Sequence, residues 1–90
     1  MQRQRTLVYS KKDCPNCDAL KQLLKKENIQ YETVNIFTPD AMTDLAMNNV
    51  ITRSAPVLQI EDRFYTTREL CTQDIIDQNK VKEIIKSGAI

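Results

Sequence analysis

Two cysteines with two residues between them, Cys14 and Cys17, are the strongest chemical signal in the sequence. The apolar run Leu7–Tyr9 precedes them and is typical of a buried strand, while leucines at helical spacing follow them. The pair therefore lies where a strand gives way to a helix. Pro15 suits the first helical position, because its missing N–H would have no helical partner there. Cys14 then becomes the N-cap residue, and its sulfur faces the free N–H groups and the positive end of the helix dipole.

This position favours dithiol–disulfide exchange. A thiolate is stabilised at a helix N-terminus, so we expect the pKa of Cys14 to be lowered and its sulfur to react near neutral pH. Cys17 lies one helical turn further on, close enough to form a disulfide with Cys14. Half of a zinc site is one alternative, but such a site normally needs four Cys or His ligands, and the chain has no His and one further cysteine, Cys71. Two inert core cysteines are another alternative, although the Pro-Asn between them is not typical of a core.

The composition fits one small domain over residues 1–90. The net charge of +1, without a basic stripe, argues against a protein that binds nucleic acid through its phosphates. No apolar run is long enough to span a membrane, and none follows the basic start as a secretory signal would require. Three cysteines are a poor basis for a secreted disulfide framework, so we expect a cytoplasmic protein. We also expect a monomer that holds no metal and no cofactor.

The alternation of strand and helix patterns predicts an α/β fold in the order β-α-β-α-β-β-α. A right-handed crossover makes the first two strands parallel, and a hairpin supplies two more, which gives a four-stranded mixed sheet with helices on both faces. Open α/β sheets keep their sites at the carboxyl ends of the strands, where Cys14 lies. The predicted strands are Arg5–Ser10, Ile29–Ile36, Val57–Ile60 and Arg63–Thr66. The first predicted helix is Pro15–Glu27. The second runs from its N-cap Thr38 to Asn48-Asn49, and the third from its N-cap Asp77 to Gly88.

The second predicted helix has a polar start and an apolar face. Thr38 is a typical N-cap, followed by proline and an acidic residue. Phe37 before the cap and Met42 after it are spaced to form a hydrophobic staple. Met42, Leu45 and Ala46 are expected to form the face that packs on the sheet.

The segment Thr67–Ile76 is too polar to assign to a helix or a strand. Leu70 and Cys71 are its expected buried anchors. We therefore expect Cys71 to be a structural core cysteine, and a regulatory or dimer-forming thiol is the alternative.

The sequence resembles the glutaredoxin and thioredoxin superfamily, and most closely the small glutaredoxin-like redoxins. The resemblance rests on the stretch from Tyr9 to Cys17 and on the later segment Ser54-Ala55-Pro56-Val57. It implies a thioredoxin-like fold, with Cys14 as the attacking thiolate and Cys17 as the resolving thiol. Cys14 would attack a substrate disulfide, and Cys17 would then open the mixed disulfide.

The resemblance also implies five substrate-binding residues. Pro56 would be cis and lie beside the cysteines, with the backbone of Ala55 pairing with the substrate; a trans proline at the start of a strand is the alternative. Lys11 matches the lysine that glutaredoxins place three residues before the first cysteine, where it holds the thiolate or meets a substrate carboxylate; a solvated lysine is the alternative. Pro15 and Asn16, between the cysteines, complete the set.

The chain departs from the glutathione-using pattern in two places. Asn16 stands where those proteins commonly have Tyr, and Tyr65–Arg68 stands where they have a Gly-Gly pair whose backbone meets the glutathione carboxylate. The predicted reductant is therefore either glutathione or a thioredoxin-reductase-type flavoenzyme, as in the similar redoxins that serve ribonucleotide reductase. The predicted function is reduction of protein disulfides through Cys14 and Cys17, with ribonucleotide reductase as a candidate partner. An iron–sulfur carrier and a non-catalytic redox-sensing module are the alternatives.

Overall fold

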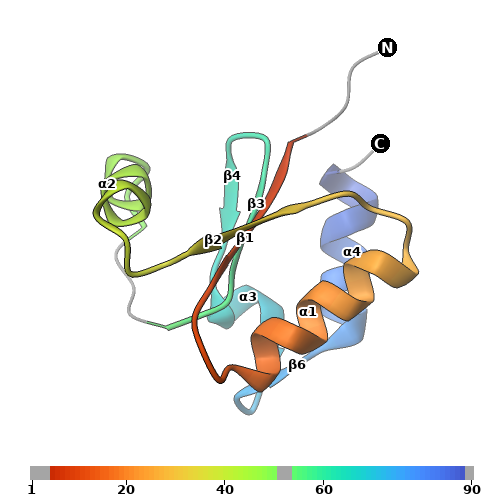
Figure 1. Ribbon diagram of the computed structural model, residues 1–90. Coiled ribbons are helices and arrows are strands. Elements are labelled where there is room, and N and C mark those ends of the chain that lie inside the picture. The colour runs from red at the N-terminus through yellow and green to blue at the C-terminus, as the bar shows by residue number, and fades with distance from the viewer. Residues whose placement is uncertain (1–4, 51–53, 89–90) are drawn as a thin grey trace.

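Strand β1 (Thr6–Ser10) is the centre of the fold, and all five of its residues are buried. The computed structural model describes residues 5–50 and 54–88. In its four-stranded sheet the order is β2-β1-β3-β4, with β1 parallel to β2 and antiparallel to β3, and with β3 and β4 forming an antiparallel hairpin (Figure 1). The predicted mixed sheet is therefore confirmed. The other three strands are β2 (Glu32–Asn35), β3 (Val57–Ile60) and β4 (Arg63–Tyr65).

The helices cover both faces of this sheet, as predicted. Figure 1 shows α1 and α4 on one side of the strands and α2 on the other. The helices are α1 (Pro15–Lys26), α2 (Pro39–Met47), the short α3 (Thr67–Leu70) and α4 (Gln78–Gly88).

Side chains that alternate along β1 divide the core into two clusters, because successive residues of a strand point to opposite faces. Val8 packs with leucines of α1 and with Val81 of α4. Leu7 and Tyr9 pack instead with residues of α2. The cysteine pair belongs to this second cluster, so both of the site's sulfur atoms are anchored in the core.

Helix α2 buries Leu45, as predicted, but the rest of its buried face differs from the prediction. Ala41 and Leu45, one turn apart, are buried at 2% and 3% exposure. Met42, expected in the core, is 56% exposed, and Ala46 is exposed as well. The small side chain of Ala41 faces the sheet, which turns its neighbour Met42 away, since successive helical residues lie about 100° apart. Phe37 is also 56% exposed, so the predicted staple shields neither of its members.

The second strand is shorter than predicted, because residues 29–31 serve to end α1. Asn28 adopts the left-handed conformation with φ of 60°, and the N–H of Ile29 donates to the carbonyl of Leu24 at 2.9 Å. This is the usual way in which a residue with positive φ closes a helix C-terminus. Strand pairing then begins at Glu32.

The unassigned segment contains three elements that the predicted order lacks, one helix and two strands. Helix α3 begins with a capping box, in which the N–H of Thr66 donates to the Glu69 carboxylate at 2.8 Å. Strands β5 (Cys71–Thr72) and β6 (Ile75–Ile76) then form a small hairpin. Leu70 and Cys71 are buried, as predicted, at 0% and 8% exposure.

Helix α4 starts where the sequence places it. Asp77 accepts hydrogen bonds from the N–H groups of Asn79 and Lys80 at 3.0 and 3.2 Å, which confirms it as the N-cap. The hydroxyl of Thr72 also donates to this carboxylate, at 2.8 Å. These bonds hold the pKa of Asp77 below its usual value, with the bond from Thr72 as the largest cause. The N-cap therefore ties the β5–β6 hairpin to the start of α4.

Candidate active site

Cys14 is the N-cap of α1, as the sequence predicts. Its backbone is extended, with φ of −120° and ψ of 98°, and Pro15 is the first helical residue. The backbone N–H of Cys17 donates to the sulfur of Cys14 at 3.1 Å. The two cysteines form a disulfide, with their Cα atoms 5.2 Å apart. The free N–H groups at the start of α1 are thus available to a negative charge on Cys14.

The two sulfur-bearing residues differ in access. Cys14 is 6% exposed, whereas Cys17 is completely buried. A molecule that approaches from outside therefore meets Cys14 first. This order of access matches the roles of attacking and resolving thiol that the family resemblance implies.

The segment before β3 lies against Cys14. The carbonyl oxygen of Ala55 is 3.9 Å from the Cys14 sulfur, and both residues are buried. The Ala55–Pro56 peptide bond is cis, as the resemblance implies. Pro56 is itself almost fully buried, so it shapes the site through the backbone of Ala55 beside it.

Asn16 has an unexpected structural partner, the β5–β6 hairpin. Its Nδ2 donates to the carbonyl of Asp74 at 2.9 Å, and its Oδ1 accepts the N–H of Ile76 at 3.2 Å. The residue between the two cysteines therefore holds a segment about sixty positions further along the chain. Sequence reasoning placed Asn16 at the substrate but did not find this hairpin, whose sequence carries no glycine or proline to mark a turn.

A pocket of about 200 Å³ lies beside the disulfide. It brings together three of the predicted binding residues, Lys11, Asn16 and Ala55, while Pro15 is exposed on the helix start. Lys11 gives the lining of this pocket a positive charge, and Asp74 gives it a negative one. The lining residues are Lys11, Asn16, Ser54, Ala55, Thr67, Cys71 and Asp74.

Cys71 also lines this pocket, although most of the residue is buried. Burial raises the pKa of its thiol, the Asp74 carboxylate raises it further, and the Lys80 ammonium acts in the opposite direction. Cys71 is therefore held as a neutral thiol near neutral pH, which makes it a weak nucleophile. Its environment is the opposite of that of Cys14, which sits at the positive end of a helix.

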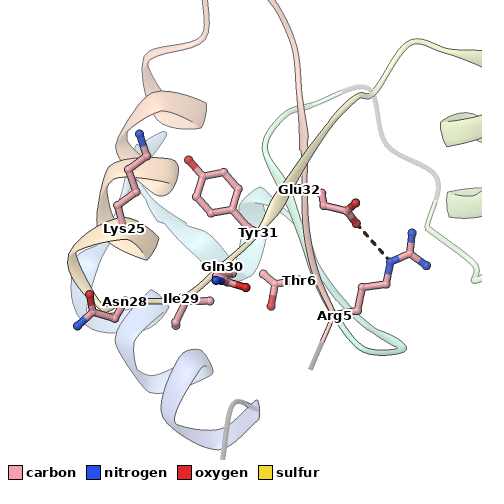
Figure 2. A pocket seen from close by; sticks show the side chains of 8 residues that line it. All are labelled: Arg5, Thr6, Lys25, Asn28, Ile29, Gln30, Tyr31 and Glu32. Atoms are coloured by element: carbon pink, nitrogen blue, oxygen red, sulfur yellow. Dashed lines mark ion pairs between the residues drawn. The ribbon is translucent and has the colours of Figure 1, made fainter. Parts of the chain in front are cut away.

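A wider groove of about 820 Å³ lies at the other end of β1 (Figure 2). Thr6, the first residue of β1, lines it, whereas Cys14 follows the last residue of that strand. Figure 2 shows its side chains pointing in different directions, with Arg5 and Glu32 paired at 3.5 Å on one side.

Two further findings concern metals and membranes. Within residues 5–50 and 54–88, no three His, Cys, Asp or Glu side chains gather in a way that could hold a metal ion. No helix in that same part of the chain combines the length and apolar character that crossing a bilayer requires.

The glutaredoxin family model matches residues 6–65, which extend from β1 to the end of β4 and include the cysteine pair and the Ala55–Pro56 bond. The chain belongs to the glutaredoxin family. Members of this family are generally thiol–disulfide oxidoreductases, so this glutaredoxin-family chain is a thiol redox protein. No match to its sequence was found among the curated proteins.

Solved structures agree with this assignment. NrdH-redoxin from Escherichia coli, described as a glutaredoxin-like protein with a thioredoxin-like activity profile, is 25% identical, with 69% of this chain and 80% of that chain covered and a TM-score of 0.58. The glutaredoxin of Archaeoglobus fulgidus is 22% identical and has a TM-score of 0.63. The match covers 92% of this chain and 87% of that chain. A thioredoxin-like protein, solved as a point mutant, is 21% identical and has a TM-score of 0.66. The match covers 91% of this chain and 95% of that chain. The fold is thus thioredoxin-like.

Proposed function

We propose that this protein reduces disulfides of other proteins through the dithiol form of Cys14 and Cys17. The observation that carries the proposal is the position of Cys14. It is the N-cap of α1, its sulfur accepts the N–H of Cys17, and it is the more exposed member of the pair. A helix N-terminus stabilises the thiolate that disulfide exchange requires.

The reaction has two exchange steps. The Cys14 thiolate attacks one sulfur of the substrate disulfide, a new S–S bond joins Cys14 to the substrate, and the second substrate sulfur leaves as a thiolate that takes up a proton. Cys17 then loses its proton and attacks the Cys14 sulfur, which releases the first substrate sulfur as a thiolate that is also protonated. Two electrons and two protons pass to the substrate, and the Cys14–Cys17 disulfide described above is the oxidised product.

Ala55 is suited to align a polypeptide substrate. Its carbonyl lies 3.9 Å from the reacting sulfur, on the segment that leads into β3. A substrate chain that runs beside this segment can form strand-like hydrogen bonds with it, as in other cases of recognition by strand addition. Such pairing would bring the substrate disulfide to Cys14.

The reductant that we propose is a thioredoxin-reductase-type flavoenzyme rather than glutathione. In glutathione users, the backbone near the start of the corresponding helix meets a glutathione carboxylate. Here the N–H and the hydroxyl of Thr66 both donate to the chain's own Glu69 carboxylate, each at 2.8 Å. Burial acts to raise the pKa of Glu69, but these bonds, a bond from its own backbone N–H and the Arg68 guanidinium together hold the pKa below its usual value. A second carboxylate would therefore meet an occupied donor and a negative charge.

The proposed setting is the cytoplasm, where disulfides are usually transient and catalytic. Ribonucleotide reductase is the first protein substrate to test. The similarity to NrdH-redoxin, the most identical of the three structures described above, supports this order of testing.

Three cysteine variants test the proposed function. Cys14→Ser should abolish disulfide reduction, and Cys17→Ser should accumulate a mixed disulfide with the substrate that mass spectrometry detects. Cys71→Ala is the matched control and should keep the activity, because the Cys71 thiol is buried and held neutral. Turnover by Cys14→Ser at the wild-type rate would contradict the proposal.

The choice of reductant has its own experiment. The oxidised protein is mixed either with excess reduced glutathione or with NADPH and a thioredoxin reductase, and free thiols are counted over time. Rapid reduction by the flavoenzyme and slow reduction by glutathione is the expected result. Rapid reduction by glutathione would show that the occupied start of α3 does not exclude it.

A further inference from the structure

The β5–β6 hairpin has an inner and an outer face. Cys71 pairs with Ile76, and both are buried against the core. Thr72 pairs with Ile75, and their side chains point to the opposite, outer face, because side chains alternate along a strand. Ile75 is 67% exposed. A hairpin that needed the outer face only for solubility would carry polar residues there.

Asn16 fixes the position of this hairpin relative to Cys14. Its amide donates to the carbonyl of Asp74 and accepts the N–H of Ile76, the two backbone groups that flank Ile75. A residue of a parallel neighbouring strand would use the same two groups, so the Asn16 side chain takes the place of a strand. Figure 1 shows the hairpin beside the first turn of α1, in agreement with these bonds.

Ile75 also differs in place from the other large exposed apolar side chains of the described residues. Phe37, Met42 and Met47 all lie on α2 or directly before it, across the sheet from α1. Ile75 instead follows Asp74, which lines the pocket beside the disulfide together with Asn16 and Ala55. Ile75 therefore lies next to a residue of the pocket, and the hydrogen bonds from Asn16 to Asp74 and Ile76 hold it close to the cysteine pair.

We propose that the β5–β6 hairpin is a recognition element for polypeptide substrates and that Asn16 is its positioning residue. This inference rests on the proposed function. Ile75 contacts an apolar side chain of the substrate polypeptide close to the disulfide that Cys14 attacks. Burying apolar surface favours this contact, whereas a small disulfide without a flanking polypeptide gains nothing from it. The hairpin therefore selects protein disulfides over small ones.

The test uses the full chain, reduced with dithiothreitol and freed of it. Its second-order rate constants are measured by stopped flow with insulin as the protein disulfide and with dithiobis(nitrobenzoic acid) as the small disulfide. Ile75→Thr keeps a β-branched residue in the strand but removes the apolar surface. We expect the ratio of the insulin rate to the small-disulfide rate to fall about tenfold, as loss of one well-buried aliphatic contact implies.

Met47→Thr is the matched control, because Met47 is 78% exposed on α2. Its ratio should equal that of the wild type. An unchanged ratio in Ile75→Thr, or an equal fall in Met47→Thr, would overturn the recognition role. If the wild-type protein reduces neither disulfide, the proposed function itself fails, and that result is distinct from an unchanged ratio.

Asn16→Ala tests the positioning role through a readout other than rate. The backbone N–H of Ile76 should exchange with solvent faster than in the wild type, and the insulin ratio should fall in the same direction as in Ile75→Thr. Asn48→Ala is the control, since it removes an Asn side chain that donates to the carbonyl of Asp44 at 2.8 Å, away from the site. Unchanged protection of Ile76 in Asn16→Ala would refute the positioning role.

Discussion

The turn of the β5–β6 hairpin stores backbone strain that a single substitution should relieve. Its two central residues, Gln73 and Asp74, have φ of 52° and 63°. A two-residue hairpin turn of this kind favours Asn or Gly at both positions, because other residues crowd their own backbone at positive φ. Asp tolerates this conformation better than Gln does. Gln73→Gly should therefore stabilise the protein.

The size of the effect follows from two opposing terms. A left-handed conformation costs an ordinary residue about 1–2 kcal/mol, which glycine avoids. Glycine also gains freedom in the unfolded chain, which costs about 0.4–1 kcal/mol. With the middle of each range, the net gain in unfolding free energy is about 0.8 kcal/mol, or about 3–6 °C in Tm for a domain of this size. The gain should appear in global unfolding, because Cys71 and Ile76 of the hairpin belong to the core cluster of Val8 and Leu20.

Thermal unfolding followed by circular dichroism measures this change. Asp62→Gly is the control, since Asp62 lies in the turn between β3 and β4 but is not among the residues with positive φ. That variant should have an unchanged or lower Tm, because it adds freedom to the unfolded chain and relieves no strain. A Tm of Gln73→Gly at or below the wild-type value would refute the argument from backbone strain.

Three further predictions concern other parts of the fold. Glu69→Ala should increase the rate at which glutathione reduces the protein, because it frees the N–H of Thr66, and a thiol count that shows no increase would contradict this. Asp77→Asn should lower Tm at neutral pH but not in acid. Folding lowers the pKa of Asp77, so its ionised form stabilises the protein at pH values above the pKa of the unfolded state. That contribution disappears as the pH falls through the pKa of the folded state. Leu58→Ala, at a completely buried position of β3, should cost about 2–5 kcal/mol in urea unfolding, and a loss well below this would mean that the core closes around the gap.

The cysteine site was largely predictable because its signals are local. Pro15 marks the first residue of α1, which fixes Cys14 as the N-cap from sequence alone. The periodicity of the leucines that follow gave the helix and its buried face. The cis bond before Pro56 was not predictable in this way, since most X–Pro bonds are trans, and it came from the family resemblance.

The β5–β6 hairpin could not be predicted, because the bonds that hold it are not local. Gln73-Asp74 lacks the Asn-Gly or Gly signal of a two-residue turn, and each strand has only two residues. The bonds from Asn16 join segments 58 and 60 residues apart. Helix α3 did have a readable signal, because Thr66 and Glu69 have the spacing of a capping box.

The buried face of α2 shows a different limit of prediction from sequence. Met42 and Ala46 are as apolar as the residues that the helix buries, so hydrophobicity alone cannot choose between adjacent stripes of a short helix. The choice depends on which side chain allows a close approach to the sheet, and the small Ala41 does so. That information lies in the packing of two elements and not in either one.

Asn16 and Glu69 both support the proposed preference of this chain for proteins over glutathione. Asn16 lies between the cysteines, and Glu69 lies in the first turn of α3. Each side chain is bonded to the chain's own backbone: Asn16 to β6 and its turn, and Glu69 to Thr66. A small peptide thiol that used these groups would have to break existing hydrogen bonds, so it would gain little free energy in exchange. A protein substrate does not need them, because it can bind through the backbone of Ala55 and the exposed side chain of Ile75. In the proposed scheme, the bonds of Glu69 oppose glutathione, and the bonds of Asn16 hold the hairpin that carries Ile75.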